Sequence, residues 1–98
     1  MPIYLIATLK SKSEYRQDIK AMLENMVVQT RKEEANLRYD LHQGIEDENL
    51  FVFYEIWADD TGLSTHNARD YIQDFVASEG KLQEPVQIYK TRLLPATD

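Results

Sequence analysis

Residues 51–57, with the sequence FVFYEIW, constrain the fold most because they read as a strand with large apolar side chains on both faces. Successive side chains of a strand point to opposite faces. One face of this strand therefore carries the two phenylalanines and the tryptophan, and the other carries a valine, a tyrosine and an isoleucine. A sheet with one solvated face alternates apolar with polar residues instead. We therefore expect both faces of this strand to be covered.

The chain length and composition restrict what can cover them. With 98 residues, we expect a single domain over residues 1–98. No cysteine is present, which excludes disulfides and thiolate chemistry. A formal net charge of −6 with scattered basic residues disfavours nucleic acid as a partner. The N-terminus has no basic region and no apolar run reaches membrane-spanning length, so we expect no membrane partner and a cytoplasmic location.

A long amphipathic helix is predicted over residues 13–35. Its apolar side chains recur with i, i+3, i+4 and i+7 spacing, which is typical of a helix that covers a core. Ser13 is a plausible N-cap because its hydroxyl can accept from a free backbone N–H group. Asn36 is expected to close the helix in the left-handed conformation.

Two shorter helices are predicted after the central strand. Asp59 or Asp60 is expected to cap the first, which runs to about His66. The second is predicted over residues 70–79, with Gly80 as its stop signal.

Three further strands are predicted, over residues 2–9, 37–42 and 84–95. The resulting order is β-α-β-β-α-β, the ferredoxin-like split pattern of the α+β class, with a four-stranded antiparallel sheet and its helices on one face. The other sheet face is also apolar, so it needs a partner. We expect a homodimer in which a second copy covers the open sheet face.

Glu55 and Trp57, near the end of the central strand, are candidates for chemistry. Glu55 shares a strand face with Phe53 and Trp57, and a carboxylate among aromatic rings is costly to bury unless it is paired. Either Glu55 orients a partner in a ring-lined cavity, or it forms a salt bridge beside a core tryptophan.

The two histidines offer further candidates. His66 lies three residues after Leu63 on the predicted helix, so it points toward the sheet and can act as a general base or as a core histidine. His42 lies on the second strand, where it can line a pocket with Tyr39 and Arg38 or face the dimer interface or solvent. With only two histidines and no third ligand, we predict no metal site. No phosphate loop or dinucleotide fingerprint is present, so no cofactor is expected.

The segments NLRYDLHQ and FVFYEIWADDTGLSTH resemble the antibiotic biosynthesis monooxygenase domain family. The resemblance runs from IYLIATLK to KTRLLP, and YEIWADDTGLSTH is its most specific part. Within the family, the sequence looks most like small quinol monooxygenases and the enzyme that processes phosphorylated autoinducer-2. The resemblance implies a dimeric α+β barrel with a ligand cavity in each subunit. It also implies oxidation of a quinol-like substrate by dioxygen without metal or flavin.

The family pattern also implies roles for particular residues. His66 matches the family's helix histidine, which suggests a catalytic base, and Glu55 and Trp57 match its strand residues. Glu55 would orient His66 or a water molecule, and Trp57 would form a ring-stacking wall with Phe53. Relatives often carry a second histidine five residues after the first, where this chain has Tyr71.

The remaining predicted substrate-binding residues are Tyr39, His42 and Tyr71, beside Phe53. The main hypothesis is a cofactor-independent monooxygenase that acts on a small hydroquinone-like or phenolic aromatic.

Two alternatives stay open. One is an isomerase or other proton-transfer enzyme acting on a small phosphorylated ketone, with Arg38, Lys90 or Arg92 as phosphate ligands. The other is a non-catalytic dimer that binds a small ligand.

Overall fold

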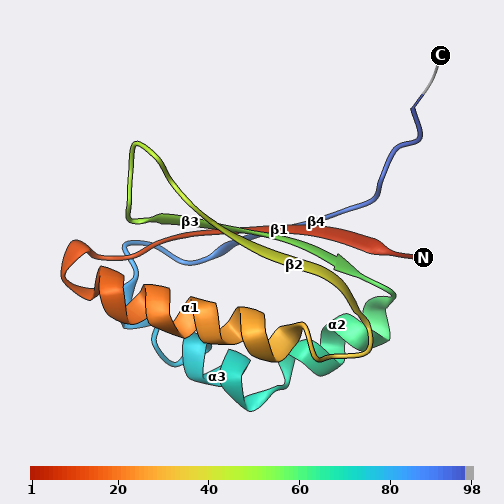
Figure 1. Ribbon diagram of the computed structural model, residues 1–98, viewed down its shortest axis with the longest axis horizontal. Coiled ribbons are helices and arrows are strands. Elements are labelled where there is room, and N and C mark those ends of the chain that lie inside the picture. The colour runs from red at the N-terminus through yellow and green to blue at the C-terminus, as the bar shows by residue number, and fades with distance from the viewer. Residues whose placement is uncertain (97–98) are drawn as a thin grey trace.

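The computed structural model describes residues 1–96 of the chain. It has the predicted order of elements, with the second crossover divided into two helices (Figure 1). The elements are β1 (Ile3–Lys10), α1 (Arg16–Thr30), β2 (Asn36–Gln43), β3 (Leu50–Trp57), α2 (Asp60–Asn67), α3 (Asp70–Val76) and β4 (Gln87–Thr91), with single 3-10 turns at Ser13–Tyr15 and Glu79–Lys81. This is the ferredoxin-like α+β fold that the sequence predicts.

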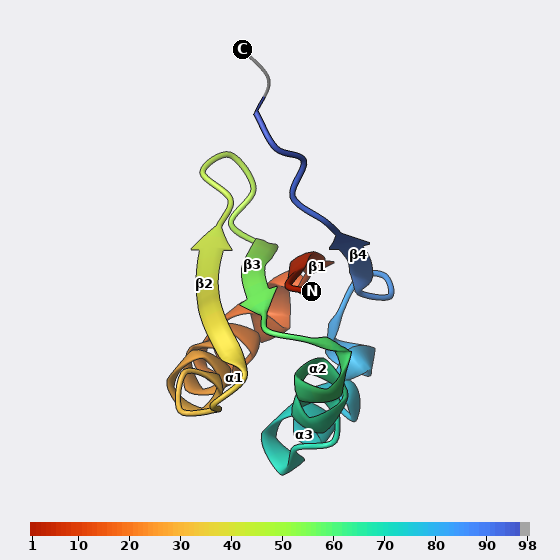
Figure 2. The same ribbon diagram turned by 90° about the vertical axis from the view of Figure 1, so that its right-hand side faces the viewer.

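The four strands form one antiparallel sheet in the order β2-β3-β1-β4. In the centre of the sheet, Ala7 of β1 lies opposite Phe53 of β3 on one side and Ile88 of β4 on the other. All three helices lie on the same side of this sheet (Figure 2). The opposite side is left open by the described residues.

The core lies between the sheet and the helices. The alternation of β3 is confirmed: its odd-numbered residues are buried and its even-numbered residues are half-buried. Core side chains from the helices include Ile19, Leu23, Met26, Leu63, Ile72 and Phe75. Burying side chains of this size stabilises a domain by about 1.5–3 kcal/mol each.

The predicted helix over residues 13–35 is too long at both ends. Its first turn, Ser13–Tyr15, is a 3-10 turn, and Ser13 caps nothing but accepts a hydrogen bond from Nδ2 of Asn49 at 2.9 Å. The α-helix ends at Thr30 and a hydrogen-bonded turn follows. Asn36 does not adopt the left-handed conformation, because it already begins β2.

The start of α2 is confirmed, and the end of α3 is corrected. Asp59 caps α2 by accepting a hydrogen bond from the backbone N–H of Gly62 at 2.7 Å. Helix α3 ends at Val76, which is 51% exposed, so it carries no core side chain beyond Phe75. Gly80 lies in a 3-10 turn with an ordinary φ and does not end the helix.

The last strand is shorter than predicted. Only Gln87–Thr91 pairs with β1, although the predicted strand spans residues 84–95. The chain then leaves the sheet and runs away from the domain (Figure 1). Leu93 and Leu94 are largely exposed there. Within residues 1–96, no helix combines the length and the apolar character that a membrane span requires.

Candidate functional site

A cavity of about 400 Å³ lies between the sheet and the helices. Its inner wall is mostly apolar and includes Leu5, Ala7, Leu9, Met26, Phe53 and Phe75. Two titratable side chains, His66 and Glu55, face it from buried positions. Asp60 and Lys90 line its exposed side, with their charged atoms 3.3 Å apart. The cavity has the size and character of a small-molecule site.

Helix α2 places His66 at this cavity. The Asp59 cap fixes the start of the helix, and Gly62 allows it to approach the turn before β2 closely. A Cβ atom on Gly62 would lie 2.2 Å from Cβ of Ala35, so only glycine fits there without a shift. One helical turn later, His66 points into the interior and is 4% exposed.

An aromatic cluster surrounds the imidazole of His66. The ring of Trp57 lies 4.4 Å from it between centroids, and the ring of Tyr39 lies 5.6 Å away. Tyr39 in turn packs on Phe53 at 4.8 Å. These rings fix the plane of the imidazole from the sheet side.

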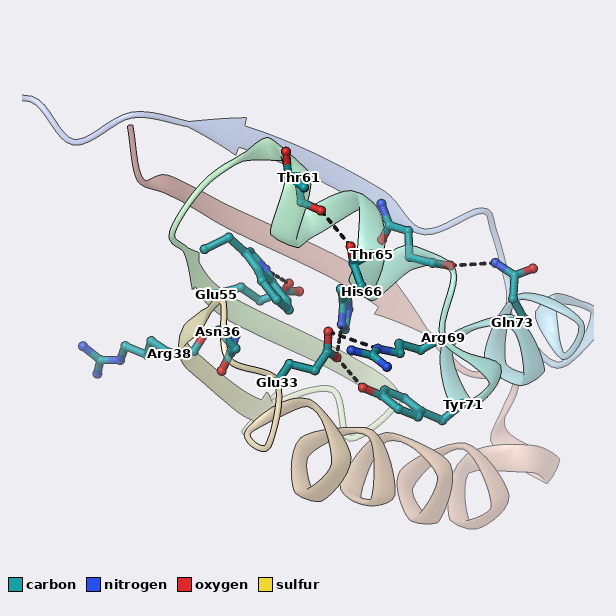
Figure 3. Close-up of polar contacts among 12 residues, drawn as sticks. Glu33, Asn36, Arg38, Glu55, Thr61, Thr65, His66, Arg69, Tyr71 and Gln73 are labelled. Carbon is teal, nitrogen blue, oxygen red and sulfur yellow. Dashed lines mark hydrogen bonds and ion pairs between the residues drawn. The ribbon is translucent and has the colours of Figure 1, made fainter.

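Glu33, in the turn that follows α1, bonds His66 from the other side (Figure 3). Its Oε2 lies 2.8 Å from Nδ1 of His66 and also accepts a hydrogen bond from the hydroxyl of Tyr71. Nε of Arg69 lies 3.6 Å from Oε1. Because a carboxylate oxygen can only accept, Nδ1 of His66 carries the proton in this arrangement.

The environment keeps His66 neutral near pH 7. Burial lowers the pKa of His66 below its ordinary value, and the hydrogen bond that His66 donates to Glu33 opposes this shift only in part. Among residues 1–96, no protein group is hydrogen-bonded to Nε2 of His66. A neutral imidazole with an unoccupied Nε2 can accept a proton from a ligand.

Glu55 differs from the prediction in its partner. Of its two predicted partners, His66 is bonded by Glu33 and not by Glu55, whose Oε1 accepts a hydrogen bond from Nε1 of Trp57 at 2.8 Å. Glu55 is 5% exposed, and burial raises its pKa to about 7, with the charge of Glu33 adding to the rise. A carboxyl group with this pKa can both give and take a proton at neutral pH.

Of the seven predicted site residues, four line the cavity, one adjoins it, and two do not reach it. Phe53, Tyr39 and Glu55 line it with His66, whereas Trp57 lies behind His66 and is fully buried. Tyr71 bonds Glu33 on the far side of His66 and lines a separate surface groove.

His42 does not belong to this cavity. It lies opposite Val52 on the open sheet face, where it is exposed and its Nδ1 is 3.2 Å from the carbonyl oxygen of Val52. The bulge between Asn36 and Arg38 does not bring this side chain round to the helices.

Only one of the three predicted phosphate ligands reaches the cavity. Lys90 lines it and is already paired with Asp60. Arg38 lies opposite Ile56 on the open face, where its Nε donates to Asp40 at 2.6 Å. Arg92 follows β4 and is absent from the cavity wall. The isomerase alternative therefore lacks its cluster of cations.

Glu33 is not among the site residues predicted from the sequence. It lies in the run RKEEAN, which looks like the solvated polar end of a helix, and no local pattern separates it from Glu34. Its partners come from a distant part of the chain, so only packing reveals its role. Among residues 1–96, no group of three or more His, Asp or Glu side chains is arranged to hold a metal ion.

Comparison with known proteins identifies the family and agrees with the fold. The family described as "Antibiotic biosynthesis monooxygenase" matches residues 2–78. "Putative monooxygenase YcnE" of Bacillus subtilis is 37% identical over 93 residues, which cover 93% of this chain and 97% of that protein.

Solved structures show the same fold. The crystal structure of PA3566 from Pseudomonas aeruginosa superposes with a TM-score of 0.89 at 31% identity, over 96% of this chain and 95% of that one. A crystal structure described as antibiotic biosynthesis monooxygenase gives a TM-score of 0.90 at 26% identity, over 95% and 99% of the two chains. The chain thus belongs to the antibiotic biosynthesis monooxygenase family.

Proposed function

We propose that this protein is a cofactor-independent monooxygenase that oxidises a small hydroquinone-like or phenolic aromatic with dioxygen. The observation that carries the proposal is the pairing, in one apolar cavity, of a buried neutral histidine with a buried carboxyl group whose pKa lies near 7. Titratable groups whose surroundings push their pKa values apart are a recurring arrangement for acid–base work. Membership of the family supports the reaction class.

The cavity suits an aromatic ring. Its wall offers the ring of Phe53 and aliphatic side chains, and the volume of about 400 Å³ accommodates a one- or two-ring compound. Apolar walls also limit water, which would protect a reactive oxygen intermediate from side reactions.

The chemistry requires a base first. Dioxygen reacts slowly with closed-shell molecules, but a deprotonated hydroquinone readily gives up one electron. Nε2 of His66 would take the hydroxyl proton, and the anion would pass an electron to dioxygen to give a semiquinone and superoxide. These two would combine at a ring carbon as a peroxide.

The peroxide must then break down with a balanced transfer of protons. A proton delivered by Glu55 or by protonated His66 gives the hydroperoxide. Loss of the hydrogen on the same ring carbon with cleavage of the O–O bond leaves a carbonyl and releases hydroxide, which departs as water. One oxygen atom stays on the ring and the other becomes water, and the net products are a hydroxylated quinone and water.

We also propose that the protein works as a homodimer through its open sheet face. The half-buried and exposed side chains on this face include Tyr4, Ile6, Val52, Tyr54, Ile56 and Tyr89. Leaving such side chains in water forgoes stabilisation of about 25 cal/mol for each Å² of apolar surface. A second copy across a two-fold axis presents a complementary surface of the same kind.

Oxygen uptake is the test of the proposed reaction. Metal-free protein is incubated with a panel of hydroquinones and naphthohydroquinones, with heat-denatured protein as the control for autoxidation. We expect uptake above the control, and we expect His66→Gln to remove at least about 99% of it, since general base catalysis contributes about 10²–10⁴-fold. His42→Gln is the matched control, because the other histidine lies on the opposite sheet face.

Uptake equal to autoxidation across the panel would contradict the proposal. Turnover of a phosphorylated ketone under nitrogen would instead identify a proton-transfer enzyme. Thermal stabilisation by aromatics without any turnover would identify a binding protein.

A further inference from the structure

Glu33 is the most heavily bonded side chain near the cavity, and the proposed reaction does not yet use it. Its side chain is 7% exposed, although it belongs to a surface turn. It accepts hydrogen bonds from the imidazole of His66 and the hydroxyl of Tyr71, and it forms an ion pair with the guanidinium of Arg69 at 3.6 Å. Figure 3 shows these three side chains converging on its carboxylate.

The two carboxylate oxygens of Glu33 have different partners. Oε2 accepts the hydrogen bonds from His66 and Tyr71, while Oε1 is paired with Arg69. Tyr71 stays a donor at neutral pH, because burial and the bond to Glu33 raise its pKa to about 12. Besides His66, the carboxylate is therefore held by Tyr71 and Arg69, which do not themselves exchange protons near pH 7.

We propose that Glu33 is a positioning residue for His66, which fixes the imidazole with its proton on Nδ1 and its free Nε2 available to the cavity, and that Tyr71 and Arg69 orient Glu33 for this task. The inference rests on the proposed function, in which Nε2 is the base. This role also explains why a tyrosine is suitable at position 71. Tyr71 donates a hydrogen bond to the carboxylate of Glu33 and does not have to act as a base.

Two physical effects follow from this arrangement. The hydrogen bond selects one tautomer, because the partner of one ring nitrogen decides which nitrogen keeps the proton. The negative charge also stabilises the imidazolium that forms once Nε2 accepts a proton, in a site where burial alone disfavours that cation. Besides Glu33, the charged and titratable groups around His66 are Arg69 and Tyr71 on the helix side and Tyr39 and Glu55 on the sheet side.

Imidazole ¹⁵N NMR tests the inference without any substrate. The chain has only two histidines, so His42 provides an internal reference in every spectrum. At pH 8 we expect His66 to be protonated on Nδ1. Glu33→Leu removes the acceptor, and we expect the Nε2-protonated form of His66 to appear. Glu33→Gln keeps an acceptor oxygen but loses the charge, and we expect the pKa of His66 to fall by about 1 unit.

Steady-state kinetics tests the consequence for turnover. We expect Glu33→Leu to lower kcat about 10-fold to 100-fold, because His66 is no longer held in one tautomer. KM should change little, because the residues that line the cavity are the same. In Glu33→Gln, the rising limb of the rate against pH moves to lower pH with the pKa of His66. Tyr71→Phe should lower kcat less than either variant, because His66 and Arg69 still hold the carboxylate.

Glu34→Gln is the matched control, since it removes the same charge from the neighbouring exposed position. A merely structural Glu33 would lower stability in its variants but leave the His66 tautomer, its pKa and the pH profile unchanged, and that result would overturn the inference. If the NMR spectra change as expected while no hydroquinone is oxidised, the positioning role stands and the proposed reaction fails. If oxidation occurs but His66 carries its proton on Nε2 in the unsubstituted protein, the positioning role fails alone.

Discussion

The two faces of strand β3 differ in burial, although a single run of residues forms both. The side chains that face the helices are almost completely buried, including Glu55, whereas those between them are only half-buried on the open face. Both sets are largely apolar. The difference shows that hydrophobic content alone does not decide burial within one subunit: the helices cover one face, and the other face remains available for a second copy.

The two faces also differ in their polar groups. On the covered face, Glu55 and His66 each have one specific partner, and burial shifts their pKa values. On the open face, Arg38 and Asp40 pair in solvent, where such pairs contribute little. Chemistry is therefore expected only on the covered face.

The largest expected effect is on core stability. Phe51→Ala removes a ring that is 1% exposed and leaves a cavity, so we expect a loss of about 3–5 kcal/mol in the free energy of unfolding. Val52→Ala, on the opposite face of the same strand, should cost less than half as much. Denaturant titrations at one fixed protein concentration measure both. Equal losses would mean that the two faces are equally buried in solution.

The second prediction concerns pH and Glu55. Its pKa is about 7 in the folded protein and 4.5 in the unfolded chain, so the folded state binds more protons between these values. Stability therefore falls as the pH rises from 4.5 to above 7, by about 3 kcal/mol from this group. We expect Glu55→Gln, which cannot titrate, to gain stability relative to the unsubstituted protein over that range.

Unfolding free energies at pH 4.5 and pH 8 measure this gain. Glu84→Gln, at an exposed position, keeps Glu55 and is the control: its stability should follow that of the unsubstituted protein at both pH values. A difference between Glu55→Gln and the unsubstituted protein that is the same at both pH values would show that folding does not change the pKa of Glu55.

The third prediction concerns the placement of α2. Gly62→Ala forces its new methyl group against Ala35, so we expect a loss of about 1–3 kcal/mol and reduced turnover as His66 is displaced. Gly80→Ala has open space around the new methyl group and should change stability by less than about 0.5 kcal/mol. Thermal unfolding and oxygen uptake of both variants make the comparison. Identical behaviour would show that the approach of α2 to Ala35 does not fix the helix.

The smallest expected effect is on assembly. Ile6→Lys puts a charge in the middle of the open face, and we expect the dissociation constant of the dimer to rise at least about tenfold, or 1.4 kcal/mol. Ile45→Lys makes the same change in an exposed loop and should leave assembly unchanged. Sedimentation velocity over a range of concentrations measures both. A monomeric unsubstituted protein at micromolar concentration would contradict the dimer.

Much of the fold and part of the site could be predicted from sequence, because both depend on local periodicity. The alternation of β3, the Asp59 cap and the inward direction of His66 are properties of neighbouring residues. Helix ends were less predictable: residues 31–35 look helical, but the chain must turn there to begin β2. The end of β4 also depends on its partner strand, since only five residues of β4 pair with β1.

The sequence by itself determined the class of fold, the apolar character of both sheet faces and the identity of His66 and Glu55 as the titratable candidates. Only the tertiary structure decided their partners: Glu33 for His66, Trp57 for Glu55, and the open face for His42. The physical reason is that periodicity assigns a side chain to a face, whereas a hydrogen bond needs two atoms within about 3 Å. For His66 and Glu33, that distance is set by how α2 packs against the turn that follows α1, 33 residues away along the chain.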